Sequence, residues 1–287
     1  MKQTIDFKFE IELFLNCSIF LLFQIIIWIK IDMMEKKILI PRSIGGNLHA
    51  VHFLSQGGYS SQDEKKLPFV IICHGFTGDK YEIGRFPKTA KTLNDAGFDA
   101  LIFDFSGSGE NEREMLTLSK QVRDLEDVYD WAKTQGYSWI SVIGLSFGGL
   151  TALVANLPEI KTLIFWAPAF YMRKFFTPST EENLKKKPFT IQSSGDYDPI
   201  TIDNTFVDSL SKYDVNSYLQ KLVTPALIIL GKKDGTIGPA DICEGFKLLP
   251  QDDHHELIEV DNATHDFEDQ HLAIFIEASI DWLKKYL

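Results

Sequence analysis

The stretch Val142-Ile143-Gly144-Leu145-Ser146-Phe147-Gly148-Gly149 decides the fold of this chain. It belongs to a short apolar run typical of a buried strand, and it continues into Leu150–Leu157, whose composition favours a helix. Glycine stands two positions before and two positions after Ser146. A sharp turn from a strand into a helix brings the two elements so close that side chains at these positions would collide. The pattern therefore predicts a strand, a tight turn that carries the serine, and a helix.

This arrangement is typical of a nucleophile elbow. The hydroxyl of Ser146 and the amide of Phe147 are both expected at a helix N-terminus, where unpaired N–H groups and the helix dipole favour developing negative charge. A serine hydroxyl is a weak nucleophile until a base takes its proton, so a histidine supported by a carboxylate is expected downstream.

The rest of the chain alternates strand-like and helix-like segments, which predicts an α/β fold with a mostly parallel central sheet flanked by helices. A hairpin of Lys37–Pro41 and Leu48–Leu54 is expected first. Continuous apolar runs, typical of strands buried on both faces, are Leu67–Cys73, Phe98–Phe105, Trp139–Ile143, Thr162–Trp166, Ala226–Leu230 and Glu256–Val260. Helical patterns cover Tyr81–Ala96, Leu118–Thr134, Phe147–Leu157, Pro239–Leu249 and Gln270–Leu287. Residues 34–287 are thus expected to form one domain.

The segment 169–202 interrupts this alternation. It is polar, rich in lysine and too long for a plain connection, so it predicts a small lid, followed by a helix near Asn204–Lys221. Aromatic side chains at its edges would line a substrate pocket, or else form a small core within the lid itself. The candidate substrate-binding residues are Phe170, Tyr171, Phe175 and Phe176.

Two loops after predicted strands supply the partners of the serine. Asp234 follows the run Ala226–Leu230, and His265 follows the run Glu256–Val260 and precedes the last helical pattern. We therefore predict Ser146, Asp234 and His265 as a catalytic triad. The other histidines fit less well because of their positions: His254 and His255 precede their strand, and His271 lies inside the closing helix.

The negative charge of a reaction intermediate needs two fixed hydrogen-bond donors. One is expected to be the amide of Phe147, directly after the nucleophile. The second is expected from the loop His74-Gly75-Phe76-Thr77-Gly78, in which the amide of Phe76 is the natural donor. Asp104 also ends a predicted strand, but it precedes the serine in the chain, and we interpret it as structural.

Composition excludes several classes of function. The net charge of −11 and the lack of a basic stripe interleaved with aromatic residues argue against nucleic-acid binding. The sequence has no metal-ligand spacing of histidines or cysteines, so no metal and no cofactor are expected. The three cysteines lack the spacing of a disulfide framework, which favours a reducing compartment.

The first 33 residues differ from the rest. An apolar run at residues 13–31 is interrupted by polar side chains, and it is borderline for a membrane span. Two interpretations stay open: a dispensable extension of a cytoplasmic protein, or an anchor in the inner membrane. The lysines and arginine after the run would place the catalytic domain of an anchored form in the cytoplasm.

From residue 36 onward, the chain resembles the α/β-hydrolase superfamily. The motifs stand in the family's order: His-Gly-Phe-Thr-Gly at 74, Asp-Phe-x-Gly-x-Gly at 104 (here Asp104-Phe105-Ser106-Gly107-Ser108-Gly109), Gly-x-Ser-x-Gly-Gly at 144, Gly-x-x-Asp at 231 and Thr264-His265. The first motif and the short lid are similar to cinnamoyl and feruloyl esterase-like carboxylesterases, with serine aminopeptidase and lysophospholipase-like proteins as close relatives.

The resemblance implies hydrolysis of a small-molecule carboxylic ester through an acyl-enzyme. An acyl thioesterase, a monoacylglycerol lipase or an aminopeptidase would use the same triad. A substrate with a free amine would call for a lid carboxylate, for which Glu181, Glu182 and Asp196 are candidates. A binding scaffold without catalysis is the alternative from another class, and it is disfavoured because such a protein need not keep all three triad residues.

Overall fold

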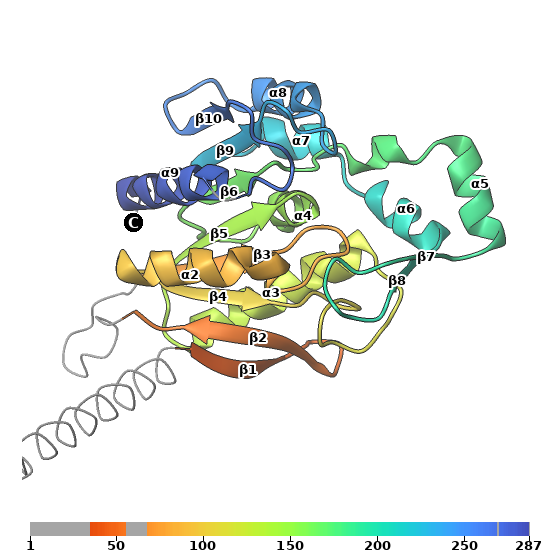
Figure 1. Cartoon of the computed structure of the whole chain (residues 1–287), viewed down its shortest axis with the longest axis horizontal. Coiled ribbons are helices and arrows are strands. Elements are labelled where there is room, and N and C mark those ends of the chain that lie inside the picture. Colours follow the sequence, from red (N-terminus) through yellow and green to blue (C-terminus); the bar gives the residue numbers. More distant parts are fainter. Residues whose placement is uncertain (1–34, 56–67, 269, 287) are drawn as a thin grey trace, which may run out of the picture.

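An eight-stranded sheet forms the centre of the computed structural model, which describes residues 35–55, 68–268 and 270–286 (Figure 1). The strand order is β1-β2-β4-β3-β5-β6-β9-β10. β1 pairs antiparallel with β2, and β2 with β4, whereas all the following pairs are parallel. The strands are β1 (Glu35–Pro41), β2 (Asn47–Phe53), β3 (Pro68–Cys73), β4 (Asp99–Phe103), β5 (Trp139–Leu145), β6 (Leu163–Trp166), β9 (Ala226–Gly231) and β10 (His255–Val260).

Helices cover both faces of this sheet (Figure 1). One face packs against α2 (Arg85–Asp95) and α9 (Gln270–Tyr286), and the other against α3 (Leu118–Thr134), α4 (Phe147–Ala155) and α8 (Pro239–Leu248). Successive side chains of a strand point to opposite faces, so the neighbours Ile71 and Ile72 of β3 belong to two separate cores. This double burial explains the continuous apolar runs, and the predicted α/β fold is confirmed.

Two helix predictions were wrong in detail. The segment predicted as one helix from Tyr81 to Ala96 is broken: Glu82 and Ile83 have left-handed backbone conformations in a short helix, η1 (Glu82–Gly84), before α2 begins. The segment near Asn204–Lys221 forms two helices, α6 (Asn204–Leu210) and α7 (Val215–Gln220). The second one starts anew because the Asp214 carboxylate accepts a hydrogen bond from the Ser217 amide at 3.2 Å.

The connection from β6 to β9 carries the lid, which projects from one end of the molecule (Figure 1). It contains η2 (Met172–Phe175), α5 (Pro178–Lys186) and the antiparallel hairpin of β7 (Phe189–Ile191) and β8 (Ile200–Ile202), and α6 and α7 lead back to the sheet. Leu184 and Phe206 are buried in the same hydrophobic cluster as the sheet face that packs against α3 and α4.

The N-terminal segment 1–33 lies outside the described residues, and both interpretations of it stay predictions. Within the part of the chain that the structure describes, no helix combines the length and the apolar character needed to cross a membrane.

Candidate active site

Ser146 lies at the carboxyl end of β5, directly before α4, with φ 52° and ψ −113°. Its backbone is fixed by hydrogen bonds, because its amide donates to the Trp166 carbonyl at 2.8 Å and its carbonyl accepts from the Ala169 amide at 2.9 Å. The flanking glycines are required: a Cβ on Gly144 would lie 2.7 Å from the Gly148 carbonyl oxygen, and one on Gly148 would lie 2.5 Å from the His74 carbonyl oxygen. A strained serine at a strand-to-helix turn has the conformation of a nucleophile elbow.

Asp234 and His265 lie together in the loops after β9 and β10. The Nδ1–H of His265 donates to Asp234 Oδ2 at 2.7 Å. The other carboxylate oxygen, Oδ1, accepts from the amides of Thr236 at 2.9 Å and Ile237 at 2.8 Å. The carboxylate is completely buried, whereas 19% of the imidazole surface is exposed. Asp234 is thus rigidly held, and it fixes the ring of His265 through Nδ1, while Nε2 has no hydrogen-bond partner among the described residues.

The serine and the Asp234–His265 pair share one edge of the sheet. β5, β6, β9 and β10 are successive parallel strands, so all three residues follow the carboxyl ends of neighbouring strands. Among the described residues no hydrogen bond joins His265 to Ser146, and catalytic contacts of this kind often tighten only when substrate binds. The triad roles stay predictions that this arrangement allows.

The loop after β3 lies against the nucleophile. A Cβ on Gly75 would be only 3.4 Å from the Ser146 Cβ, and the rings of Phe76 and Phe147 meet edge to face at 5.9 Å. Within the described parts of the chain, neither the Phe76 amide nor the Phe147 amide donates a hydrogen bond. Two such free amides beside the serine are what an oxyanion hole requires.

His74 holds this loop in place. The Phe105 amide donates to His74 Nε2 at 3.0 Å, so the proton is on Nδ1, which donates to the Gly75 carbonyl at 2.8 Å. The ring is fully buried. Its two hydrogen bonds connect the loop after β3 to the end of β4.

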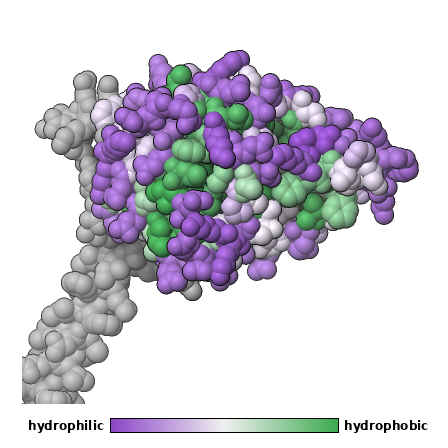
Figure 2. Space-filling model, turned by 90° about the horizontal axis from the view of Figure 1, so that it is seen from above, coloured by the Kyte–Doolittle hydropathy of each residue, from purple (hydrophilic) through white to green (hydrophobic). Residues whose placement is uncertain are grey.

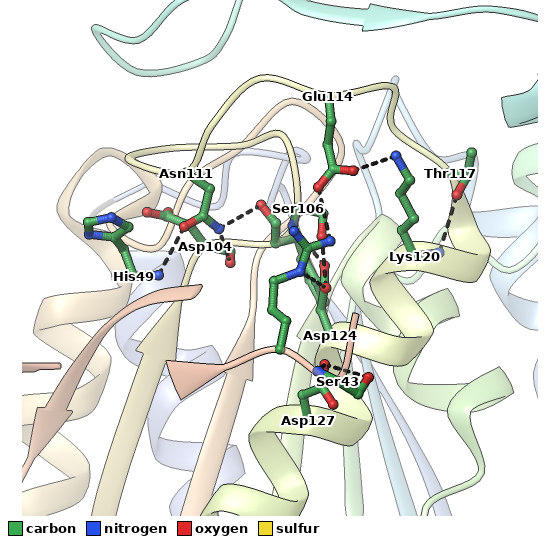
Figure 3. Close-up of polar contacts among 12 residues, drawn as sticks. Ser43, His49, Asp104, Ser106, Asn111, Glu114, Thr117, Lys120, Asp124 and Asp127 are labelled. Carbon is green, nitrogen blue, oxygen red and sulfur yellow. Dashed lines mark hydrogen bonds and ion pairs between the residues drawn. The ribbon is translucent and has the colours of Figure 1, made fainter. Parts of the chain in front are cut away.

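Asp104 belongs to a buried polar network (Figure 3). Its carboxylate accepts from the Lys80 ammonium at 2.6 Å and from the Glu110 amide at 3.0 Å, and it is completely buried. Farther along the same loop, the Ser106 amide and hydroxyl both donate to Asp124 at 2.7 Å, and burial raises the pKa of that carboxyl. The network fixes the loop after β4, and Asp104 has a structural role, as its position in the chain indicated.

The lid contacts the loop after β3 through its hairpin. Ser194 donates to the Thr77 carbonyl from its amide at 3.0 Å and from its hydroxyl at 2.9 Å, and the Ser193 hydroxyl donates to the same oxygen at 3.3 Å. Thr77 has a left-handed backbone with φ 63°. The lid is thereby hydrogen-bonded to the residue directly after Phe76.

The four candidate substrate-binding aromatics do not share one pocket wall. Phe170 is buried in the core, with its ring 5.3 Å from that of Phe165. It lines, with Tyr171, a hollow of about 230 Å³ beside α7. Phe175 is half exposed, and Phe176 packs 5.5 Å from the Phe206 ring. Phe170 is therefore part of the main core, and contact of any of the four residues with substrate stays a prediction.

Phe176 lines a different cavity, and Phe76 lines it too. This cavity of about 600 Å³ lies between α5 and the lid hairpin, and it is mainly apolar. Apolar side chains also reach the surface at the lid end of the molecule, among hydrophilic ones (Figure 2). The residues that line the cavity are Phe76, Phe176, Thr180, Asn183, Leu184, Lys187, Pro188, Phe189, Thr190, Ile191 and Ile202. Through Phe76, the cavity adjoins the loop beside the nucleophile.

Two residues of the site had not been predicted from the sequence. Glu82 and Arg85 form an ion pair at 2.9 Å next to the loop after β3, and both are largely buried. Their only signal in the sequence is a spacing of three residues, which is common on exposed helices. In residues 35–55, 68–268 and 270–286, no group of three or more His, Cys, Asp or Glu side chains is placed to hold a metal ion.

Comparison with curated proteins gives local matches. A protein described only as an uncharacterised 31.7 kDa protein in the traX-finO intergenic region of Escherichia coli is 36% identical over 89 residues. A carboxylesterase of Bacillus subtilis is 29% identical over 89 residues. Each alignment covers 29% of this chain, and 30% and 34% of the relatives, so the chain matches about a third of the length of these proteins.

Solved structures match over most of the chain. Est1E from Butyrivibrio proteoclasticus, with ferulic acid bound, has a TM-score of 0.71 and 25% identity over 87% of this chain and 98% of that one. A monoacylglycerol lipase of Paleococcus ferrophilus has a TM-score of 0.64 and 18% identity over 84% of this chain and 99% of that one, a likeness of fold alone.

The family itself follows from a match to a family model described as serine aminopeptidase, S33, which covers residues 64–212, more than half of the chain. This region contains the loop after β3, the elbow and most of the lid. The resemblance to α/β hydrolases is confirmed, and the chain belongs to the serine aminopeptidase S33 family of that fold.

Proposed function

We propose that this protein hydrolyses carboxylic esters through an acyl-enzyme on Ser146. One observation carries the proposal: a strained serine, a carboxylate-held imidazole and two free backbone amides lie at the same edge of the sheet. A nucleophile, an oriented base and an oxyanion hole are together sufficient for acyl transfer.

In the acylation step, the Oγ of Ser146 attacks the ester carbonyl carbon while Nε2 of His265 takes its proton. The carbonyl electron pair moves to the oxygen, and the amides of Phe76 and Phe147 stabilise the resulting oxyanion. When the tetrahedral intermediate collapses, the C–O bond to the alcohol breaks, and the alcohol leaves with the proton from His265. Asp234 stays ionised and stabilises the imidazolium.

Deacylation repeats these steps with water. His265 takes a proton from the water, the hydroxide oxygen adds to the acyl carbon, and the bond to Ser146 Oγ breaks as His265 returns the proton. The products are the free acid and the regenerated serine. All groups used are side chains and amides of this chain, so the mechanism needs no cofactor.

The lid cavity suggests which part of the ester is recognised. Its aromatic and aliphatic lining, about 600 Å³, suits a hydrophobic acyl group, and Phe76 connects it with the oxyanion loop. Ferulic acid, bound in the Est1E structure, is an aromatic acid of fitting character. We therefore propose esters of aromatic or medium-length hydrophobic acids as the substrate class.

An aminopeptidase activity, although the family description names one, is less well supported by the lid. A free α-amine would need an uncommitted carboxylate near the site. Glu181 already pairs with Arg173 at 2.6 Å, and Glu182 with Lys186 at 2.7 Å. Asp196 is exposed. Two of the three candidate carboxylates are therefore already paired, which favours an ester substrate over an N-terminal peptide bond.

The test is a comparison of kcat/KM for methyl ferulate and p-nitrophenyl butyrate, with the Ser146→Ala protein as background. A preference for the ferulate supports a slot for aromatic acids, and a preference for butyrate restricts the substrates to short aliphatic acids. Turnover of neither ester above the Ser146→Ala background, by folded protein, would refute ester hydrolysis.

A further inference from the structure

We infer that the Glu82–Arg85 ion pair is a positioning clamp that ties the oxyanion loop to the loop of the catalytic histidine. The catalytic effect of this clamp rests on the proposed function. The physical link between the two loops rests on geometry alone. Here the oxyanion loop means residues 74–79 and the histidine loop residues 261–268.

Glu82 holds the oxyanion loop. Its Oε1 accepts a hydrogen bond from the Gly75 amide at 2.9 Å, and its Oε2 accepts from Arg85 at 2.9 Å. The residue is 4% exposed. A Cβ on Gly78 would overlap this carboxylate, so glycine at 78 is what allows it to lie under the loop. The amide that Glu82 fixes is the one directly before the proposed oxyanion donor, Phe76.

Arg85 holds the histidine loop with the same guanidinium. One NH group donates to the Asp266 carbonyl at 2.8 Å, and the guanidinium carbon lies 5.0 Å from the centre of the Phe267 ring. That ring is itself fixed, because it stacks on Phe275 of α9 at 4.4 Å. The carbonyl that Arg85 binds belongs to the residue directly after His265.

The backbone between the two residues of the clamp is strained. Glu82 has φ 42° and Ile83 φ 55°, values that are unfavourable for residues with a Cβ and for the β-branched isoleucine above all. The Ile83 side chain remains 73% exposed, so no burial of that side chain compensates for the strain. Strain of this kind persists where the surrounding structure demands it, and it concentrates at functional sites.

Stability alone is a weak explanation for the ion pair. Removing two charges from water offsets most of their mutual attraction, so buried ion pairs add little net stability. Positioning of the proposed catalytic groups is a better explanation. The oxyanion donors come from the loop after β3 and from the elbow, whereas the base comes from the loop after β10. Small displacements between such groups lower the rate strongly, and the clamp connects them through two side chains.

The catalytic test compares Arg85→Met with Arg85→Lys and with a matched control, Arg42→Met. Arg42 is similarly buried, with 13% of its side chain exposed against 15% for Arg85, and it also binds carboxylates, those of Glu114 and Asp124. We expect Arg85→Met to lower kcat for the better ester about 10- to 100-fold, with KM changed less than about 3-fold. Arg85→Lys keeps the charge but not the forked geometry of the guanidinium, so its kcat should lie between those of wild type and Arg85→Met.

Arg42→Met should leave kcat within about 3-fold of wild type, because its carboxylates fix a different loop. A kcat of Arg85→Met equal to wild type would overturn the positioning role. Equal losses in Arg42→Met and Arg85→Met would overturn it too, since they would indicate general loosening.

Hydrogen exchange tests the tie without any substrate. In Arg85→Met we expect faster amide exchange in both the oxyanion loop (74–79) and the histidine loop (261–268), and in neither loop of Arg42→Met. Faster exchange in only one segment, or in neither, would overturn the clamp. If wild-type protein hydrolyses no ester, the proposed function fails, while the exchange result still decides whether the two loops are tied.

Discussion

The carboxyl edge of the sheet and the lid are built in different ways. At the sheet edge, Ser146 and Asp234 are almost completely buried, and each is held by several hydrogen bonds or close backbone contacts. In the lid, Phe175 and Phe189 are at least half exposed, and much of the cavity wall consists of side chains from one short helix and one hairpin. The proposed chemistry therefore depends on positions set by the backbone at the sheet edge, whereas the proposed fit of substrate depends on lid side chains that can change at little cost to the fold.

The largest effect should come from the sheet edge. In Asp234→Asn, an amide NH₂ would face Nδ1 of His265 and favour the wrong tautomer, so we expect kcat to fall about 10⁴-fold with an unchanged fold. The matched control is Asp261→Asn, because this exposed side chain lies at the start of the histidine loop and forms an ion pair with Lys232 at 2.8 Å. It should keep kcat within about 3-fold of wild type. Equal activity of the two variants would contradict the role of Asp234.

The free energy of unfolding should also depend on pH, through a buried histidine of the sheet that lies outside the lid. His52 in β2 is buried, donates to the Tyr137 hydroxyl at 3.1 Å, and has its pKa lowered to about 4 by burial. The unfolded chain therefore binds a proton more readily than the folded one between about pH 6.5 and pH 4, and stability falls as pH falls through this window. For His52 alone, the loss from pH 7 to pH 5 is about 2 kcal/mol.

Chemical unfolding of wild type and His52→Gln at both pH values measures this contribution. The variant should lose about 2 kcal/mol less than wild type between pH 7 and pH 5, whatever its stability at pH 7. Burial also lowers the pKa of His255, so part of the pH dependence should remain. An identical pH dependence in both proteins would contradict a buried neutral His52.

The smallest effect should come from the lid. Phe176→Ala removes one wall of the cavity, so we expect kcat/KM for an aromatic ester to fall about 3- to 10-fold, mainly through KM. The neighbouring and half-exposed Phe175 serves as the matched control, and Phe175→Ala should change kcat/KM less than about 2-fold. If Phe175→Ala lowered kcat/KM as much as Phe176→Ala, the cavity would not be the site that binds the acyl group.

The sequence predicted the sheet edge better than the lid, for physical reasons. A Cβ on Gly144 would meet the backbone of Gly148 and Gly149, only a few residues away, so the pattern around Ser146 could be recognised locally. The order of strands placed Asp234 and His265 because parallel strands end at one edge. Phe170 could not be assigned in the same way, since an aromatic residue looks alike whether it completes the core or lines a pocket.

Glu82 shows a second limit of sequence reasoning. Its helical surroundings predicted a continuous helix, but its carboxylate is drawn under the oxyanion loop by the Gly75 amide and by Arg85. Left-handed conformations at Glu82 and Ile83 have no local signal, because glycine is the residue that normally marks them. These tertiary hydrogen bonds override the helix propensity of the segment.

Intact-mass measurement after reaction with a fluorophosphonate tests whether Ser146 is a nucleophile activated by the Asp234–His265 pair. We expect one adduct on wild type, located on Ser146 by peptide mapping, no adduct on Ser146→Ala, and labelling at least about 100-fold slower on His265→Gln. Absence of an adduct on folded wild type, or equal labelling of wild type and His265→Gln, would show that the Asp234–His265 pair does not activate Ser146.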